Sequence, residues 1–190
     1  AYVIAVHVPI FGMSLLPVFV ADWPLVLLPL QVAFLELIID PTCSIVFEAE
    51  ETDPRIMEDP PRGLGQPMFG GRVLAISALQ GISSLLAVVA VYAWVVSSGR
   101  PDEVVRSVTF VTLVVGNLAL ILVNRSWRLS IAETFRQRRN PAVMWVLCAA
   151  SALLVLLLSV PWLRAAFNLG PIGLTDWLVA GVAGIAGVLW

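Results

Sequence analysis

Long, uninterrupted apolar segments alternate with short polar stretches along the whole chain. Residues 73–99, 107–124 and 140–163 contain no charged side chain. A run of about 18 or more such residues is long enough to cross a bilayer as a helix, whereas a transmembrane β-strand alternates over about 10 residues. The pattern predicts an all-α, polytopic transmembrane helical bundle. Six spans are expected, at about 1–20, 24–47, 73–97, 106–124, 141–162 and 173–190.

Composition supports an integral membrane protein and argues against several other classes. Hydrophobic residues make up 59% of the 190 residues and charged residues 13%, against about 25% charged in soluble domains. No basic arm or aromatic-basic face is present, so we expect no nucleic acid partner. The two cysteines, Cys43 and Cys148, lie in apolar stretches without CxxC spacing, which argues against a disulfide framework.

The arginines predict how the bundle is oriented. The chain has no lysine, and eight of its 11 arginines lie in the segments 48–72 and 125–140. Positive charge favours the cytoplasmic side, so we expect these two segments to be cytoplasmic loops. The first span begins at residue 1 and the last ends in apolar sequence at Trp190, so we expect the chain to be part of a longer protein.

The candidate chemistry lies in the second span, in LLPLQVAFLELIIDP. Glu36 and Asp40 are four residues apart, so they share one face of a helix. A charge at mid-membrane costs roughly 2.5–3.5 kcal/mol on insertion scales, and two like charges also repel. A bound cation or protons would relieve both penalties, and carboxylate oxygens are the ligands that Ca²⁺ and Mg²⁺ prefer. The alternative is that both residues are protonated or paired with arginine.

Prolines flank this acidic pair and predict irregular helices around it. Pro41 disfavours α geometry at Asp40, and Pro29 acts in the same way upstream. Pro9 in the first span would free the carbonyl of Ala5 for a ligand. Broken helices of this kind mark ion sites near the middle of the membrane.

Two further polar residues are candidate cation ligands. His7 lies within one turn of Pro9, and Asn117 lies in the middle of the fourth span, in VVGNLAL. Packing or hydrogen bonding is the alternative role for His7, and hydrogen bonding between helices is the alternative for Asn117. No phosphate-binding loop, nucleophile–base arrangement or metalloprotease motif is present, so we expect no catalytic and no cofactor-binding residue.

These motifs together resemble the membrane region of P-type cation-transporting ATPases, from the fifth to the tenth membrane helix. PLQVAFLELIIDP followed by DPRIMEDPPR is similar to the sixth helix and the next cytoplasmic loop of calcium pumps and their bacterial relatives. RSVTFVTLVVGNLALILVNRS resembles the eighth helix and LTDWL the start of the tenth. The pattern P-x-Q-x-x-x-x-N/E-x-x-x-D, then D-x-x-I-M-x-x-P-P-R, is matched at Pro29, Gln31, Glu36, Asp40, Asp53, Ile56, Met57, Pro60, Pro61 and Arg62.

The resemblance implies a cation site and shows where this chain departs from the family. Asp40 matches the central aspartate of the sixth helix, Glu36 falls where calcium pumps have asparagine, and His7 falls near an asparagine ligand of the fifth helix. Asn117 falls where the eighth helix carries a glutamate. Two other ligand positions are lost: Ile39 stands in place of a threonine and Ile10 in place of a glutamate. The resemblance therefore implies one site around Glu36 and Asp40.

The expected function is that of the ion-binding transmembrane half of an ATP-driven cation pump. The phosphorylated aspartate motif DKTGT and the nucleotide domain are missing, so we expect ATP and Mg²⁺ to bind only in the missing head. The expected partners are the lipid bilayer of a bacterial plasma membrane, a transported cation (Ca²⁺ or another divalent ion) and the amino-terminal part of the same pump. The alternatives are a stand-alone secondary transporter or channel, and a structural membrane subunit.

Overall fold

The computed structural model describes residues 2–20, 23–49, 70–124 and 140–189, and this part of the chain is helical without strands. The predicted all-α membrane bundle is confirmed. The helices are α1 (Tyr2–Phe19), α2 (Pro29–Pro41), η1 (Thr42–Val46), α3 (Gly71–Ser97), α4 (Asp102–Asn124), α6 (Pro141–Ser159), α7 (Pro161–Ala166) and α8 (Leu174–Ala186).

Among the described residues, five helical segments are long and apolar enough to cross a membrane, counting α2 and η1 as one segment. The last predicted span contains only α8, whose 13 residues extend about 20 Å, less than the roughly 30 Å hydrocarbon core of a bilayer. A membrane crossing at 173–190 therefore stays a prediction. The second predicted span also begins late, because residues 24–28 are extended and the helix starts at Pro29.

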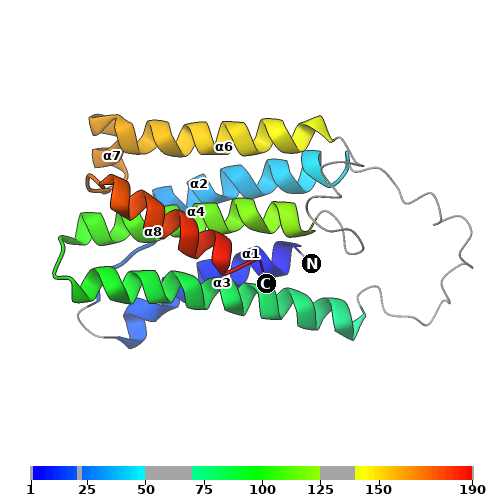
Figure 1. Ribbon diagram of the computed structural model, residues 1–190, viewed down its shortest axis with the longest axis horizontal. Coiled ribbons are helices and arrows are strands. Elements are labelled where there is room, and N and C mark those ends of the chain that lie inside the picture. Colours follow the sequence, from blue (N-terminus) through cyan, green and yellow to red (C-terminus); the bar gives the residue numbers. More distant parts are fainter. Residues whose placement is uncertain (1, 21–22, 50–69, 125–139, 190) are drawn as a thin grey trace, which may run out of the picture.

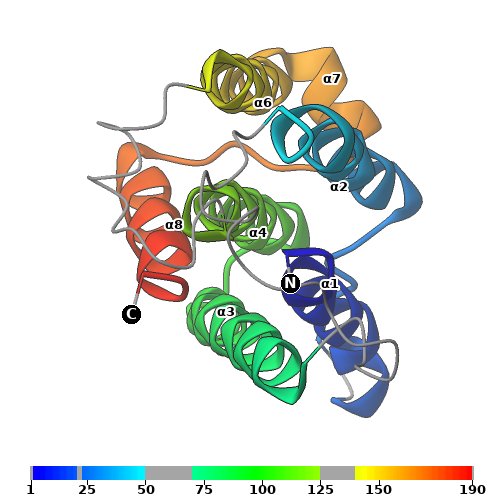
Figure 2. The ribbon, with the colours of Figure 1, turned by 90° about the vertical axis from the view of Figure 1, so that its right-hand side faces the viewer.

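The long helices lie side by side, with α4 in the middle (Figures 1 and 2). Helix α4 packs against α8, α3 and α1, and 78% of its most apolar window is buried. Helices α6 and α7 lie on the far side of α2 (Figure 2). The bundle core is therefore built around α4, while α2 lies between α4 and α6.

Glycines allow α4 and α8 to approach closely. A Cβ atom added at Gly184 of α8 would lie 2.8 Å from the carbonyl oxygen of Thr112 and 3.0 Å from the backbone nitrogen of Gly116. Contacts this short involve backbone, which cannot move aside as a flexible side chain can. Small residues at helix contacts favour packing in a membrane for this reason.

The two ends of the bundle differ in what the structure describes. At one end, here called the linker end, the described connections are residues 23–28, 98–101 and 167–173. At the opposite end, η1 and α4 finish and α3 and α6 begin (Figure 1). The predicted cytoplasmic loops and the DPRIMEDPPR motif fall almost entirely on residues 50–69 and 125–139, which lie outside the described residues.

Candidate functional site

The two acidic residues of α2 lie on its less buried side. The buried side of α2 is formed by Gln31, Phe34, Leu35, Ile38 and Ile39. Asp40 is exposed and the Glu36 side chain is 40% exposed, and their spacing of four residues places them on one helix face. The predicted shared face is therefore present. We call the exposed side of α2 that carries Glu36 and Asp40 the open face.

Helix α1 brings His7 to this open face. The Nε2 atom of His7 lies 3.7 Å from Oε1 of Glu36, which is an ion-pair distance and too long for a hydrogen bond. The Nδ1 atom lies 2.7 Å from the carbonyl oxygen of Val3, one turn earlier in α1. When Nδ1 carries the proton and donates it to that carbonyl, Nε2 faces Glu36 with a free lone pair, which is the form that binds metal ions.

The expected break in α2 at Asp40 is absent. Asp40 and Pro41 are both helical, and the chain continues into the π-helix η1, in which the backbone nitrogen of Phe47 bonds to the carbonyl of Thr42. The wider π-helical turn accommodates the proline without unwinding the helix, and such turns occur often at functional sites. The Asp40 carbonyl accepts a hydrogen bond from Ser44 Oγ at 2.8 Å.

Helix α1 is also continuous through Pro9, and the carbonyl freed by that proline does not face the acidic pair. A Cβ atom added at Gly81 would lie 3.0 Å from the carbonyl oxygen of Ala5, so this oxygen lies against α3. The irregular backbone predicted around Pro9 and Pro29 therefore supplies no ligand next to Glu36. Pro29 simply starts α2, a position that suits proline because the first helical N–H has no intrahelical acceptor.

Asn117 lies on the side of α4 that faces α2. Phe110 of α4 contacts Phe34 of α2 with ring centroids 5.5 Å apart, and Asn117 lies two turns further along the same face of α4. Helices α2 and α4 run in the same direction (Figure 1). Asp40 follows Phe34 by six residues and Asn117 follows Phe110 by seven, about 9 and about 10 Å along each axis. Asn117 and Asp40 therefore lie at one level.

The Asn117 side chain is fully buried, and neither its oxygen nor its nitrogen has a hydrogen-bond partner among the described residues. The hydroxyl of Tyr2, whose ring centroid lies 5.1 Å from that of Phe47, is also buried without a hydrogen-bond partner among the described residues. A buried unpaired polar group costs about 1–3 kcal/mol. Buried polar groups left unsatisfied in this way call for a water, an ion or another partner.

The four predicted ligands thus occupy two environments. His7 and Glu36 meet across α1 and α2, and Asp40 lies one turn along the same open face, whereas Asn117 is enclosed on α4. No group of three or more His, Cys, Asp or Glu side chains placed to hold a metal ion occurs within the described ranges. The ligand assignment therefore stays a prediction.

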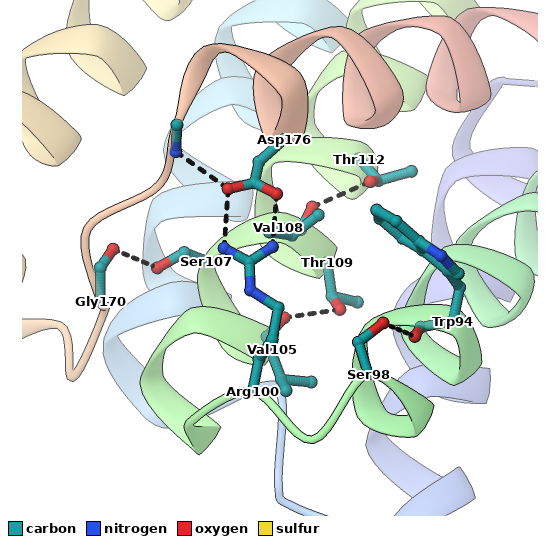
Figure 3. Close-up of polar contacts among 11 residues, drawn as sticks. Trp94, Ser98, Arg100, Val105, Ser107, Val108, Thr109, Thr112, Gly170 and Asp176 are labelled. Atoms are coloured by element: carbon teal, nitrogen blue, oxygen red, sulfur yellow. Dashed lines mark hydrogen bonds and ion pairs between the residues drawn. The ribbon is translucent and has the colours of Figure 1, made fainter.

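Two threonines and two glutamines of the described spans are hydrogen bonded to protein. Thr109 and Thr112 donate to carbonyls of their own helix at 2.8 Å each (Figure 3). Gln80 accepts from Asn124 across α3 and α4 at 3.4 Å, and Gln31 donates to the Phe167 carbonyl at 2.7 Å.

An ion pair at the linker end has no counterpart in the sequence reasoning. Both terminal nitrogens of the Arg100 guanidinium, Nη1 and Nη2, donate to the carboxylate of Asp176, and the Nη2–Oδ2 distance is 2.9 Å (Figure 3). The hydrogen bond from Arg100 to this carboxylate raises the pKa of the arginine. Asp176 also accepts from the backbone nitrogen of Gly173, which caps α8. Arg100 and Asp176 are 76 residues apart, so no local pattern predicts the pair.

The fold and the acidic pair define a class: a helical membrane protein with carboxylates inside its apolar helices. Comparison with known proteins then gives the family. The family model described as "Cation transporting ATPase, C-terminus" matches residues 24–190, so the chain belongs to this family. The chain is also 26% identical over 170 residues to a protein named calcium-transporting ATPase 1 of Lactococcus lactis. That alignment covers 88% of this chain and 19% of the relative, so the chain spans about a fifth of the relative's length.

Proposed function

We propose that the chain is the cation-binding membrane part of an ATP-driven pump and that the open face of α1 and α2 holds the cation. The observation that carries this proposal is the juxtaposition of Glu36 and His7, 3.7 Å apart within apolar helices, with Asp40 one turn further along. Intramembrane ionisable groups are costly and are usually functional. Family membership supports the pump, since the matched family consists of the carboxyl-terminal regions of cation-transporting ATPases.

Calcium is the cation that we propose. The relative from Lactococcus lactis is named as a calcium transporter, and carboxylate and amide oxygens are the donors that Ca²⁺ prefers. Glu36 and Asp40 would supply negative charge on the open face, and Asn117, enclosed on α4, stays a candidate ligand outside that face. His7 would bind or position Glu36. ATP hydrolysis, and Mg²⁺ with it, would belong to the rest of the longer protein.

The test is cation binding to the full-length protein in which this chain lies. We expect purified protein in detergent to bind ⁴⁵Ca²⁺ and the double variant Glu36→Gln/Asp40→Asn to lose that binding. A matched control is Asp102→Asn/Glu103→Gln, which neutralises two exposed carboxylates at the start of α4. Equal binding by the wild type and the double variant would remove the acidic pair from the mechanism.

A second measurement separates the pump from the other two candidate functions. In a pump, Asp40→Asn is expected to abolish Ca²⁺-stimulated formation of the phosphorylated protein from ATP, because an empty site cannot trigger phosphorylation. Ca²⁺ flux into liposomes without ATP would instead support a secondary transporter or channel. Absence of any Ca²⁺ binding by the wild type would support a structural subunit.

A further inference from the structure

Arg106 joins two connections at the linker end of the bundle. It lies in the second turn of α4, and its Nε donates to the carbonyl of Leu25 at 2.9 Å, in the linker that leads into α2. Its Nη1 donates to the carbonyl of Asn168 at 2.7 Å, just after α7. Asn168 has a φ of 52°, in the left-handed region that asparagine tolerates. One guanidinium therefore ties both segments to α4.

Gln31 makes a second junction between the same two segments. Its side chain is fully buried in the first turn of α2, its Oε1 accepts from the backbone nitrogen of Leu28, and its Nε2 donates to the carbonyl of Phe167 at 2.7 Å. The Phe167 ring also meets Phe34 edge-on, with centroids 6.2 Å apart. The start of α2 is thus held against the turn that follows α7.

These two side chains hold the start of the helix that carries Glu36 and Asp40, and the linker before it. Glu36 follows Gln31 by five residues, about 7 Å along a rigid helix. Gln31 is in the same helix as Glu36, so a shift of this helix away from the bundle would strain the Gln31–Phe167 hydrogen bond, and the Arg106–Leu25 bond holds the linker that precedes the helix. The groups that accept from Gln31 Nε2 and from Arg106 are main-chain carbonyls, of Leu25, Phe167 and Asn168, so these contacts fix backbone position.

We infer that Gln31 and Arg106 are positioning residues which together form a latch between the start of α2 and the turn after α7, and that this latch opens when the cation leaves toward the linker end. The inference rests on the proposed function. The latch acts on the release step: while it is closed, α2 is fixed against α4 and α7, and Glu36 keeps its position beside His7. Once it opens, the first turn of α2 separates from Phe167.

The experiment measures single-turnover release by the full-length protein in sealed vesicles. The protein is loaded with ⁴⁵Ca²⁺, ATP is added, and delivery of the label to the side of the linker end is timed. We expect release to be about tenfold faster in Arg106→Gln and in Gln31→Leu, since losing a charge-assisted or buried hydrogen bond changes a barrier by this order. Equilibrium ⁴⁵Ca²⁺ capacity is expected to stay at the wild-type level.

Arg100→Gln is the matched control, because it removes an arginine at the same end whose partner is Asp176 on α8 and whose side chain makes no hydrogen bond to α2 or its linker in the described structure. Its release rate is expected to equal that of the wild type. Unchanged or slower release in both latch variants, or equal acceleration in Arg100→Gln, would overturn the latch while leaving the proposed function intact. A wild-type protein that binds no Ca²⁺ would overturn both.

Discussion

Helices α2 and α4 run in the same direction and touch through Phe34 and Phe110, yet they hold their polar groups in opposite ways. The most apolar window of α4 is 78% buried, and that of the α2–η1 segment is 39% buried. Asn117 on α4 is enclosed and unpaired, whereas Glu36 on α2 is 40% exposed and faces His7. Packing is therefore concentrated around α4. The acidic pair lies on an exposed face of α2, where it makes few contacts with the rest of this chain.

This contrast has a physical consequence for substitutions. On the enclosed side, a change in volume or hydrogen bonding alters the free energy of unfolding, because neighbours cannot move aside. On the open face, the same change alters only groups that are partly exposed, and solvent or detergent compensates for it. Stability and cation binding should therefore be separable by residue.

The largest effect on stability is expected at the contact of α4 with α8. Gly184→Ala places a methyl group 2.8 Å from the Thr112 carbonyl, and we expect it to lower the free energy of unfolding by about 2 kcal/mol through overpacking. Gly181→Ala in the same helix is the control, because nothing lies within 4 Å of its new methyl group. Denaturation of the protein in mixed micelles measures both. Because alanine has the higher helix propensity, helix propensity alone would stabilise both variants. Equal losses at the two glycines would show that the close contact at Gly184 does not control stability here.

The Arg100–Asp176 pair is expected to contribute less. Asp176 is buried and Arg100 is 31% exposed, so partial screening reduces the cost of breaking the pair. We expect Arg100→Gln to lower the free energy of unfolding by about 1.5 kcal/mol in the same micelle titration. Arg72→Gln, at the exposed start of α3, is the control and should change it by less than about 0.5 kcal/mol. A loss below that value for Arg100→Gln would mean that the pair is structurally dispensable.

Replacing the two buried asparagines of α4 by leucine is expected to change the free energy of unfolding by a smaller amount, in opposite directions at the two positions. Asn117→Leu removes an amide without partners, so the free energy of unfolding should rise by about 1 kcal/mol, while ⁴⁵Ca²⁺ affinity falls. Asn124→Leu should lower the same free energy by about 1 kcal/mol, because Asn124 donates to Gln80 and to the Leu120 carbonyl. Destabilisation by Asn117→Leu would reveal a packing role and remove the argument that its amide is held ready for a ligand.

The sequence predicted features that depend on spacing within one helix. It did not predict contacts between side chains and backbone groups of different helices. The apolar runs predicted helices, and the four-residue spacing placed Glu36 and Asp40 on one face. The predicted break at Asp40 was wrong. Asp40 and Pro41 stay helical, and the helix accommodates the proline by changing from α to π geometry in η1.

Contacts through main-chain carbonyls were the second kind of information that the sequence lacked. Arg106 binds the carbonyls of Leu25 and Asn168, 81 and 62 residues away. Any residue type can present such a carbonyl, so neither acceptor leaves a signature in the sequence. The signal in the sequence was Arg106 itself, next to the start of an apolar run. An arginine at such a position is equally consistent with a charge at the membrane surface.

The smallest effect on stability is expected on the open face. Glu36→Gln removes a carboxylate that faces His7 at 3.7 Å, with 40% of the Glu36 side chain exposed. Because a partly exposed pair contributes little, losing it should lower the free energy of unfolding by less than about 0.5 kcal/mol. If Glu36 serves the cation, the same variant must bind ⁴⁵Ca²⁺ more weakly, since a neutral amide replaces a negative ligand. If Glu36→Gln instead lowered the free energy of unfolding by about 2 kcal/mol or more, the loss expected for Gly184→Ala, Glu36 would be a structural residue. The proposed difference between the open face of α2 and the enclosed α4 would then be wrong.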